Sequence, residues 1–378
     1  MCTKIESDEE KAAYVKARHW DADLAYARDD LNRAWLSAEL SLTLAQERAN
    51  KREIATVRFM IALLQYQNEN DQAARPLAEQ SMLEFQELQD AYWEARAYDI
   101  YGRALTGLGE LRHSERVLRK LELTRKAGER NHLADALFIV SIWHYIYNRI
   151  DNARKCAEGA DLLWKQIGVQ INFASMTFAL IAWSNGDYDR AKSYYIELEE
   201  QFGWQGEKHM RSGMIACLGK IALEQGDLDL AQVYLEQSLA VIREIDYKST
   251  IAIRLVELGN IRYLHGDKNR FKQMVKESIS MKRFLSGYAK AILVIALLES
   301  NAIQTHTISI QLLGAFHTFE LTNERPLRIM YKVFLPDQAI FHARETFGDA
   351  AFESAFAKGQ IMSLDEALDL ALKKVEEI

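Results

Sequence analysis

A Gly-Asp turn that returns every 40 residues most strongly limits the folds open to this sequence. The stretch Gly226-Asp-Leu-Asp-Leu-Ala231 lies between two apolar segments, and similar stretches begin at Gly186 and Gly266. Glycine permits the sharp reversal that a short connection between two helices needs. The alanine lies where the second helix would approach the first, and a bulky side chain there would push the two backbones apart. The stretch therefore predicts a helical hairpin that the chain repeats.

The same period extends over most of the chain. Alignment on the turn and on the small residue five positions later places the small residue at positions 34, 74, 114, 153, 191, 231 and 271. A constant spacing of this kind is the sequence sign of a repeat protein. Apolar residues return with helical spacing on both sides of each turn, for example Leu235, Leu239 and Ile242 after the turn at 226. Each unit is therefore predicted to be a pair of helices.

These observations predict an all-α fold, a right-handed α-solenoid of about eight helix-turn-helix repeats. The array is expected to cover residues 1–324, and a degenerate eighth hairpin is expected at 286–321. Residues 325–378 are expected to form a C-terminal helical cap, with short helices near 336–346, 349–358 and 364–376. Ser363 and Glu366 have the spacing of a capping box at the start of the last of these helices.

The repeat resembles the tetratricopeptide family. Leu218-Gly219, Ala222, Gly226 and Ala231 match its pattern, whereas Arg262 and Phe271 depart from it. The longer period of about 40 residues is similar to that of the helical-repeat sensor regions of maltose-regulator-type and LuxR-type bacterial regulators and related signalling ATPases. Phe347-Gly348, Phe352, Ala355-Phe356, Gly359 and Ser363 to Ala367 resemble their C-terminal tail. The resemblance implies a sensor or scaffold in bacterial signalling or transcriptional regulation.

Composition and motifs argue against several other classes. The net charge is −7, so no overall basic field favours nucleic acid or an anionic membrane. The sequence contains no phosphate-binding glycine loop, no His-Glu-x-x-His motif and no Cys-x-x-Cys pair. Its three cysteines and its acidic N-terminal segment suit a cytoplasmic protein. We expect no enzymatic activity, no cofactor, no bound metal, no membrane association and no direct contact with nucleic acid.

A row of aromatic residues is the first candidate binding surface. Positions eight residues before each small residue are Tyr26, Tyr66, Thr106, Tyr145, Trp183, Leu223 and Tyr263. Five of these seven are aromatic, against 10% of the whole chain. Equivalent positions in stacked repeats follow one line, so the row could line a groove on the concave face. The alternative is that the rings pack between neighbouring helices as part of the core.

Polar residues in the same phase are the second set of candidates. They are Asp23, Asp99, Arg103, Lys220 and Asn260. The guanidinium of Arg103 could bind a peptide carboxylate, or it could form a salt bridge with Asp99 one helical turn earlier. A basic cluster from Arg112 to Arg130 is interleaved with glutamates, and we expect its side chains to be exposed to solvent.

The sequence thus predicts a non-catalytic binding module with its ligand on the concave face. The expected partner is a protein or a peptide, which includes a separate effector chain. One alternative is a peptide-pheromone receptor, in which an asparagine or arginine would clamp the peptide at the end of a groove. Another alternative is a structural scaffold of a larger complex, which would expose large apolar patches.

Overall fold

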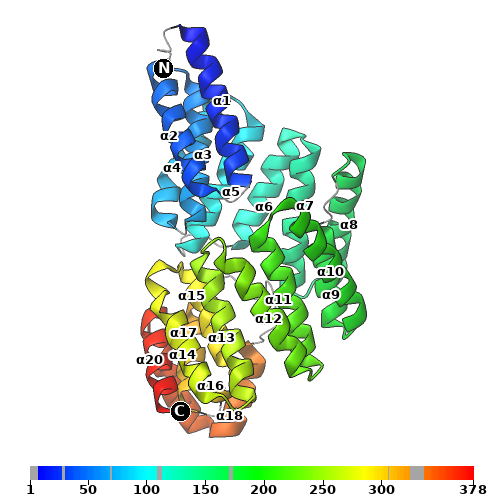
Figure 1. Ribbon diagram of the computed structural model, residues 1–378, viewed down its shortest axis with the longest axis vertical. Coiled ribbons are helices and arrows are strands. Elements are labelled where there is room, and N and C mark those ends of the chain that lie inside the picture. Colours follow the sequence, from blue (N-terminus) through cyan, green and yellow to red (C-terminus); the bar gives the residue numbers. More distant parts are fainter. Residues whose placement is uncertain are drawn as a thin grey trace. The chain divides into compact units, whose positions relative to one another are not determined.

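The structure is a computed structural model that describes residues 7–27, 30–68, 70–108, 113–169, 173–304, 306–323 and 336–378. Every regular element in these ranges is helical, and successive helices run antiparallel in pairs (Figure 1). The all-α prediction and the tetratricopeptide-like pairing are confirmed. The chain divides into two compact units, unit 1 (residues 1–137) and unit 2 (residues 138–378). None of the described helices is both long enough and apolar enough to cross a membrane.

Unit 1 contains three hairpins and the start of a fourth. Its helices are α1 (Asp8–Ala27), α2 (Leu31–Glu47), α3 (Lys51–Gln67), α4 (Asp71–Glu87), α5 (Ala91–Gly107), α6 (His113–Ala127) and the first turns of α7 (Arg130–Ile146). Ala34 and Ala74, the small residues of the first two units, are fully buried. The turn residues at 29, 69 and 109 lie outside the described residues, but the helices on both sides begin and end where the period predicts.

Unit 2 continues the same pairing. Its helices are the rest of α7, α8 (Ile150–Gln166), α9 (Ala174–Ser184), α10 (Tyr188–Gln205), α11 (Lys208–Glu224), α12 (Leu228–Arg243), α13 (Lys248–Leu264), α14 (Lys268–Ser280), the 3-10 turn η1 (Lys282–Phe284), α15 (Gly287–Leu298), α16 (Asn301–Gln304), α17 (Ile308–Asn323), α18 (Pro336–Phe347), α19 (Asp349–Gln360) and α20 (Leu364–Glu377). The eighth hairpin is α15 and α17, with the single-turn helix α16 between them.

The Gly-Asp turn has two roles that follow from its two residues. Gly186, Gly226 and Gly266 have φ values of 78°, 82° and 87°, a conformation that costs little only for glycine. The next residue begins the second helix, because its carboxylate accepts a hydrogen bond from a backbone N–H of the first turn. Asp227 accepts from the Leu230 N–H at 3.0 Å, and the other two turns are capped in the same way.

A repeated serine hydrogen bond links the two helices of four hairpins. It was not predicted from the sequence. In each case the Oγ donates to a backbone carbonyl 26 residues earlier on the first helix: Ser41 to Val15, Ser81 to Ala55, Ser238 to Ser212 and Ser278 to Ala252. These serines lie seven positions after the small residue, and all four are fully buried. The bond satisfies a buried hydroxyl group and fixes how the second helix lies on the first.

The two departures from the repeat pattern are both accommodated. Phe271 replaces the alanine and is fully buried. Gly259 on the facing helix makes room for it, because a Cβ there would lie 3.3 Å from the Phe271 ring. Arg262 extends away from the hairpin and donates to the Glu236 carboxylate at 2.6 Å.

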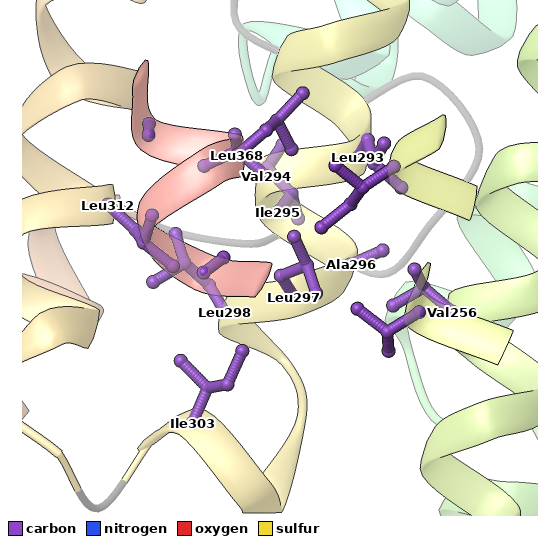
Figure 2. Packing of buried hydrophobic residues seen from close by; sticks show 14 of the residues in the cluster. Val256, Leu293, Val294, Ile295, Ala296, Leu297, Leu298, Ile303, Leu312 and Leu368 are labelled. Atoms are coloured by element: carbon purple, nitrogen blue, oxygen red, sulfur yellow. The ribbon is translucent and has the colours of Figure 1, made fainter. Parts of the chain in front are cut away.

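The C-terminal helices pack onto the last hairpins of unit 2. Helix α20 contacts α14, α15 and α17, and α19 lies along α17. Figure 2 shows the shared core, in which Leu293 to Leu298 of α15 meet Val256 of α13, Ile303 of α16, Leu312 of α17 and Leu368 of α20. The predicted capping box of Ser363 and Glu366 is confirmed. The expected boundary between the array and the cap, at residues 324 and 325, lies outside the described residues.

Candidate binding site

Three of the predicted site residues line one pocket of unit 2. The first helices of three successive hairpins, α9, α11 and α13, carry Trp183, Lys220 and Asn260 to this pocket. The pocket has a volume of about 330 Å³ and is lined by Trp183, Lys220, Leu223, Glu224, Leu235, Glu257, Asn260, Leu264, Glu299 and Asn301. This volume lies in the range of small ligand pockets and suits one or two side chains of a peptide.

A chain of ion pairs forms one wall of the pocket. Lys220 Nζ lies 3.0 Å from Glu257 Oε1 and 3.5 Å from Glu299 Oε2. The other Glu257 oxygen accepts from the guanidinium of Arg254, one turn earlier on α13, and both side chains are almost fully buried. Alternating charges therefore run from the core at Arg254 to the half-buried Glu299 at the end of α15. Lys220 is the cation that this wall offers to the pocket.

The charge of Glu257 is stabilised by its neighbours. Burial alone raises the pKa of a carboxyl group, but Arg254 and Lys220 outweigh burial here, so the pKa of Glu257 lies below its ordinary value. Glu257 is therefore ionised at neutral pH. An ionised carboxylate held by two cations fixes their positions and does not serve as a proton donor.

The opposite side of the pocket joins an indole to a carboxylate. Trp183 is 1% exposed, and its Nε1 donates to Glu224 Oε2 at 3.0 Å. The hydroxyl group of Tyr188 donates to the same oxygen at 3.2 Å. The ring of Trp183 is thus part of the hairpin core. Trp183 and the Glu224 carboxylate that it bonds both line the pocket. Leu223, Leu235 and Leu264 supply the apolar surface between the two sides.

Asn260 presents a hydrogen-bond acceptor that has no partner in the described structure. Its Nδ2 donates to the Ala296 carbonyl oxygen at 3.3 Å, which anchors the amide group. Its Oδ1 is buried and accepts no hydrogen bond. A buried polar atom without a partner is uncommon and costs about 1–3 kcal/mol. A ligand N–H at this position would satisfy it.

The other members of the aromatic row do not line this pocket. Tyr145 is 5% exposed and packs with Leu180 and Ile181. Tyr263 is half-buried, and its ring lies 5.3 Å from that of Phe271. Tyr66, in unit 1, packs at the edge of the core around Phe59. Tyr26 is in α1, but its side chain and that of Asp23 lie outside the described part of the structure. The described rings of Tyr66, Tyr145 and Tyr263 therefore take part in hairpin packing.

Asp99 and Arg103 meet in a second cluster, in unit 1. Arg103 Nε lies 2.9 Å from the Asp99 carboxylate, which is the salt bridge that the sequence offered as an alternative. Two side chains from α6 join them, since Arg116 lies 3.1 Å and Lys120 2.9 Å from Asp99. The prediction of a solvent-exposed basic face is wrong for Arg116 and Lys120. Their side chains are 7% and 12% exposed, because Asp99 draws them between the helices.

The structure adds residues that sequence reasoning missed. Glu224, Glu257, Glu299 and Asn301 line the pocket, and Arg254 orders Glu257. A signal existed in α13, where Arg254 and Glu257 interrupt an otherwise apolar run from Ile251 to Leu258. Two opposite charges at a spacing of three residues within an apolar helix indicate a buried ion pair. Glu299 and Asn301 follow the eighth hairpin's first helix, where the degraded repeat gives no phase.

Comparisons with known proteins identify a shared fold. No protein-family model matches the sequence, and no match is found among curated proteins. Among solved structures, a Rap protein complexed with competence and sporulation factor has a TM-score of 0.58 and 12% sequence identity, over 93% of this chain and 100% of that chain. The apo form of RapI has a TM-score of 0.51 and 13% identity, over 71% of this chain and 98% of that chain. The chain thus has the helical-repeat fold of these Rap proteins.

Proposed function

We propose that the protein is a non-catalytic binding module that holds a peptide or a segment of a partner protein in the unit 2 pocket. The observation that carries this proposal is Asn260 Oδ1, a buried acceptor without a partner on a residue that lines the pocket. A peptide backbone offers one N–H per residue. One such N–H would bond to Asn260, while an apolar side chain of the ligand would contact Leu223 and Leu264.

The ion-pair wall supports the same proposal. Lys220 is held at a fixed position by Glu257 and Glu299, so it can bond to a ligand carbonyl or carboxylate oxygen without a large loss of conformational entropy. Backbone bonds to Asn260 and Lys220 would give affinity, and the leucine surface would select the side chain. This combination is typical of peptide recognition on a rigid scaffold.

A comparison with the solved Rap complex supports a regulatory setting. In that structure a protein of the same fold is complexed with competence and sporulation factor. By analogy, a receptor that responds to a peptide signal is the form of the proposal that we favour. The second form of the proposal is a sensor array that serves a LuxR-type regulator. The receptor and the sensor array would each bind a ligand in the unit 2 pocket and transmit a conformational change along the repeats.

We propose no catalytic role for the pocket. A hydrolytic or transfer reaction would need a nucleophile close to a base. The described residues that line this pocket include no serine, threonine, cysteine or histidine, and Glu257 is held ionised by Arg254 and Lys220. Within the described residues, no group of three or more histidine, cysteine or acidic side chains is placed to hold a metal ion.

Selection of random 12-residue peptides on the immobilised full chain tests the proposal. We expect selected peptides to bind the wild-type protein in isothermal titration calorimetry, and Asn260→Ala to weaken binding about tenfold, which corresponds to one lost hydrogen bond. The matched control is Asn269→Ala, an exposed asparagine on α14 that does not line the pocket. Failure to select any peptide, or equal binding by a correctly folded Asn260→Ala variant, would contradict the proposal.

A further inference from the structure

One face of α5 in unit 1 carries two arginines separated by two helical turns. Arg96 and Arg103 are seven residues apart, so they share a face, and Asp99 lies between them. The guanidinium of Arg96 lies 4.5 Å from the centre of the Trp93 ring and 4.8 Å from that of Phe59. Among the described residues no carboxylate pairs with Arg96. The aromatic rings hold its charge in place and do not neutralise it.

Arg103 belongs to a cluster in which cations exceed anions. Asp99 supplies one negative charge, and Arg103, Arg116 and Lys120 all lie within 3.1 Å of its carboxylate. Burial lowers the pKa of Lys120, and Arg103 and Arg116 push it in the same direction, while Asp99 opposes them. Of the three cations, Arg103 has the most exposed side chain, at 37%. It bonds Asp99 through Nε, and its guanidinium lies 5.9 Å from the centre of the Tyr66 ring.

The surroundings of this face do not cancel its charge. Glu94 of the same helix is buried, and its carboxylate lies 3.9 Å from Lys126 Nζ. His132 of α7 lies 4.7 Å from the Tyr92 ring and is neutral at pH 7. Its pKa is lowered to about 4, first by burial and then by Arg96 and Lys120. The α5 face of unit 1, defined by Arg96, Asp99 and Arg103 with Lys120 beneath them, is thus a positive surface.

We propose that the α5 face binds an acidic peptide segment, with Arg96 and Arg103 each donating to one carboxylate of the ligand. Seven residues of helix place the two arginines about 10 Å apart along the axis. On a peptide in the polyproline II conformation, side chains three residues apart point to the same side and are separated by about 9 Å. Guanidinium groups bind carboxylates through two parallel hydrogen bonds, which gives such a pair of contacts directional specificity. The proposal does not depend on the unit 2 pocket.

Charge favours a short acidic peptide over nucleic acid. The whole chain has a net charge of −7, which repels a long polyanion. The α5 face also includes Asp99, whose carboxylate would lie close to a phosphate backbone that tracked the helix. A peptide with two separated acidic residues meets both arginines and leaves the space opposite Asp99 to a neutral residue.

Fluorescence anisotropy with the full chain tests the proposal. The probe is a fluorescein-labelled peptide with two glutamates three positions apart in a Gly-Ser background, and a glutamine version is its neutral counterpart. We expect the glutamate peptide to bind more tightly than the glutamine peptide, and to bind more weakly as salt rises. Arg96→Gln and Arg103→Gln should each weaken binding about tenfold.

The matched control is Arg283→Gln in unit 2. The guanidinium of Arg283 lies 4.5 Å from the centre of the Phe284 ring, so this change removes the same charge and the same type of contact elsewhere. Arg103→Lys, which keeps the charge, should restore part of the affinity. Arg103→Gln could perturb folding, because it removes a partner of Asp99. In that case the binding of Arg96→Gln tests the proposal, because this change breaks no ion pair.

Several outcomes would overturn the proposal. Equal binding of the glutamate and glutamine peptides would remove the role of charge, and equal losses in Arg283→Gln would remove the role of the α5 face. Tighter binding of a fluorescein-labelled 12-residue oligothymidine would assign the face to nucleic acid instead. Asn260→Ala should leave this binding unchanged, so a failure here is distinct from a failure of the unit 2 pocket.

Discussion

Glu257 shows how a single buried charge organises the unit 2 pocket. It is the one anion between Arg254 and Lys220, and Lys220 is the residue that the pocket offers to a ligand. A buried carboxylate with two cationic partners tolerates substitution poorly, since the partners cannot reach water. The position of Lys220 is thus set by a residue that belongs to the next hairpin.

Substitution of Glu257 should therefore destabilise the protein far more than substitution of an exposed partner. Glu257→Gln leaves Arg254 and Lys220 without their shared charge, and we expect a loss of about 3 kcal/mol in unfolding free energy. Glu236→Gln removes the partner of Arg262 at an exposed pair and should cost less than about 1 kcal/mol. Urea unfolding followed by tryptophan fluorescence measures both. Similar midpoints for the two variants would show that Glu257 is not energetically special.

The sequence could predict Lys220 and Asn260 but not their partners. Lys220 lies 11 positions before Ala231, and Asn260 lies 11 positions before Phe271 at the equivalent position of the next repeat, so the repeat phase identifies both. Glu257 lies at a position that holds Cys217 in the preceding unit, so no repeated pattern marks it. Its importance comes from a contact between neighbouring hairpins, and a single-sequence pattern does not contain that contact.

At the scale of the element, the two residues of the Gly-Asp turn have different roles. Glycine adopts the positive φ that ends the first helix, and aspartate caps the second. The sequence predicted the turn as a reversal only, and the capping role of the aspartate follows from the structure. Helix bounds were predictable because both signals are local in the chain.

Two substitutions in this turn should separate the two roles. Gly226→Ala forces an alanine to φ near 82° and should cost about 1 kcal/mol. Asp227→Ala removes the bond to the Leu230 N–H and should cost about 1 kcal/mol as well. Gln225→Ala, at an exposed position in the same turn, is the control and should have little effect. Thermal unfolding followed by circular dichroism measures the stability of the three variants. A loss of stability in Gln225→Ala as large as in the other two would refute the prediction.

The serine hydrogen bonds between helices could not be predicted from the repeat pattern. Ser41, Ser81, Ser238 and Ser278 share one position in the repeat, but the other units have leucine or alanine there. A serine in a helix is also compatible with an exposed face. Only the packed hairpin shows that its hydroxyl group reaches a carbonyl of the facing helix.

At the scale of the whole molecule, the period carries across a division that the sequence does not mark. The chain divides into unit 1 and unit 2 within α7, between residues 137 and 138. The 38- to 40-residue spacing of the small-residue positions continues on both sides of this division. Each unit has its own cluster of buried charges, around Asp99 in unit 1 and around Glu257 in unit 2. Among the described residues, each unit also holds a histidine whose pKa burial lowers to about 4, His132 in unit 1 and His209 in unit 2, and burial also lowers the pKa of His144 in unit 2.

His132 and His209 predict an acid-sensitive fold. The pKa of His132 and that of His209 are each lowered to about 4, chiefly by burial, with Arg96 and Arg254 respectively adding to the effect. An unfolded histidine has a pKa near 6.5, so the unfolded chain binds more protons as pH falls. Stability should be constant above about pH 6.5 and should decrease between pH 6.5 and 4. The lowered pKa of Glu257 adds a further loss only below about pH 4.5.

Substitution of each histidine shows how much of this loss of stability arises in each unit. His132→Gln and His209→Gln remove one titrating group each, so each should flatten the decrease in unfolding free energy between pH 6.5 and 4 by about 2 kcal/mol. His342→Gln, at a side chain that is 84% exposed, should leave the profile unchanged. Urea unfolding at intervals of half a pH unit measures the slopes. A wild-type profile that stays flat through this window would mean that both histidines become protonated in the folded protein without cost, which their burial between packed helices argues against.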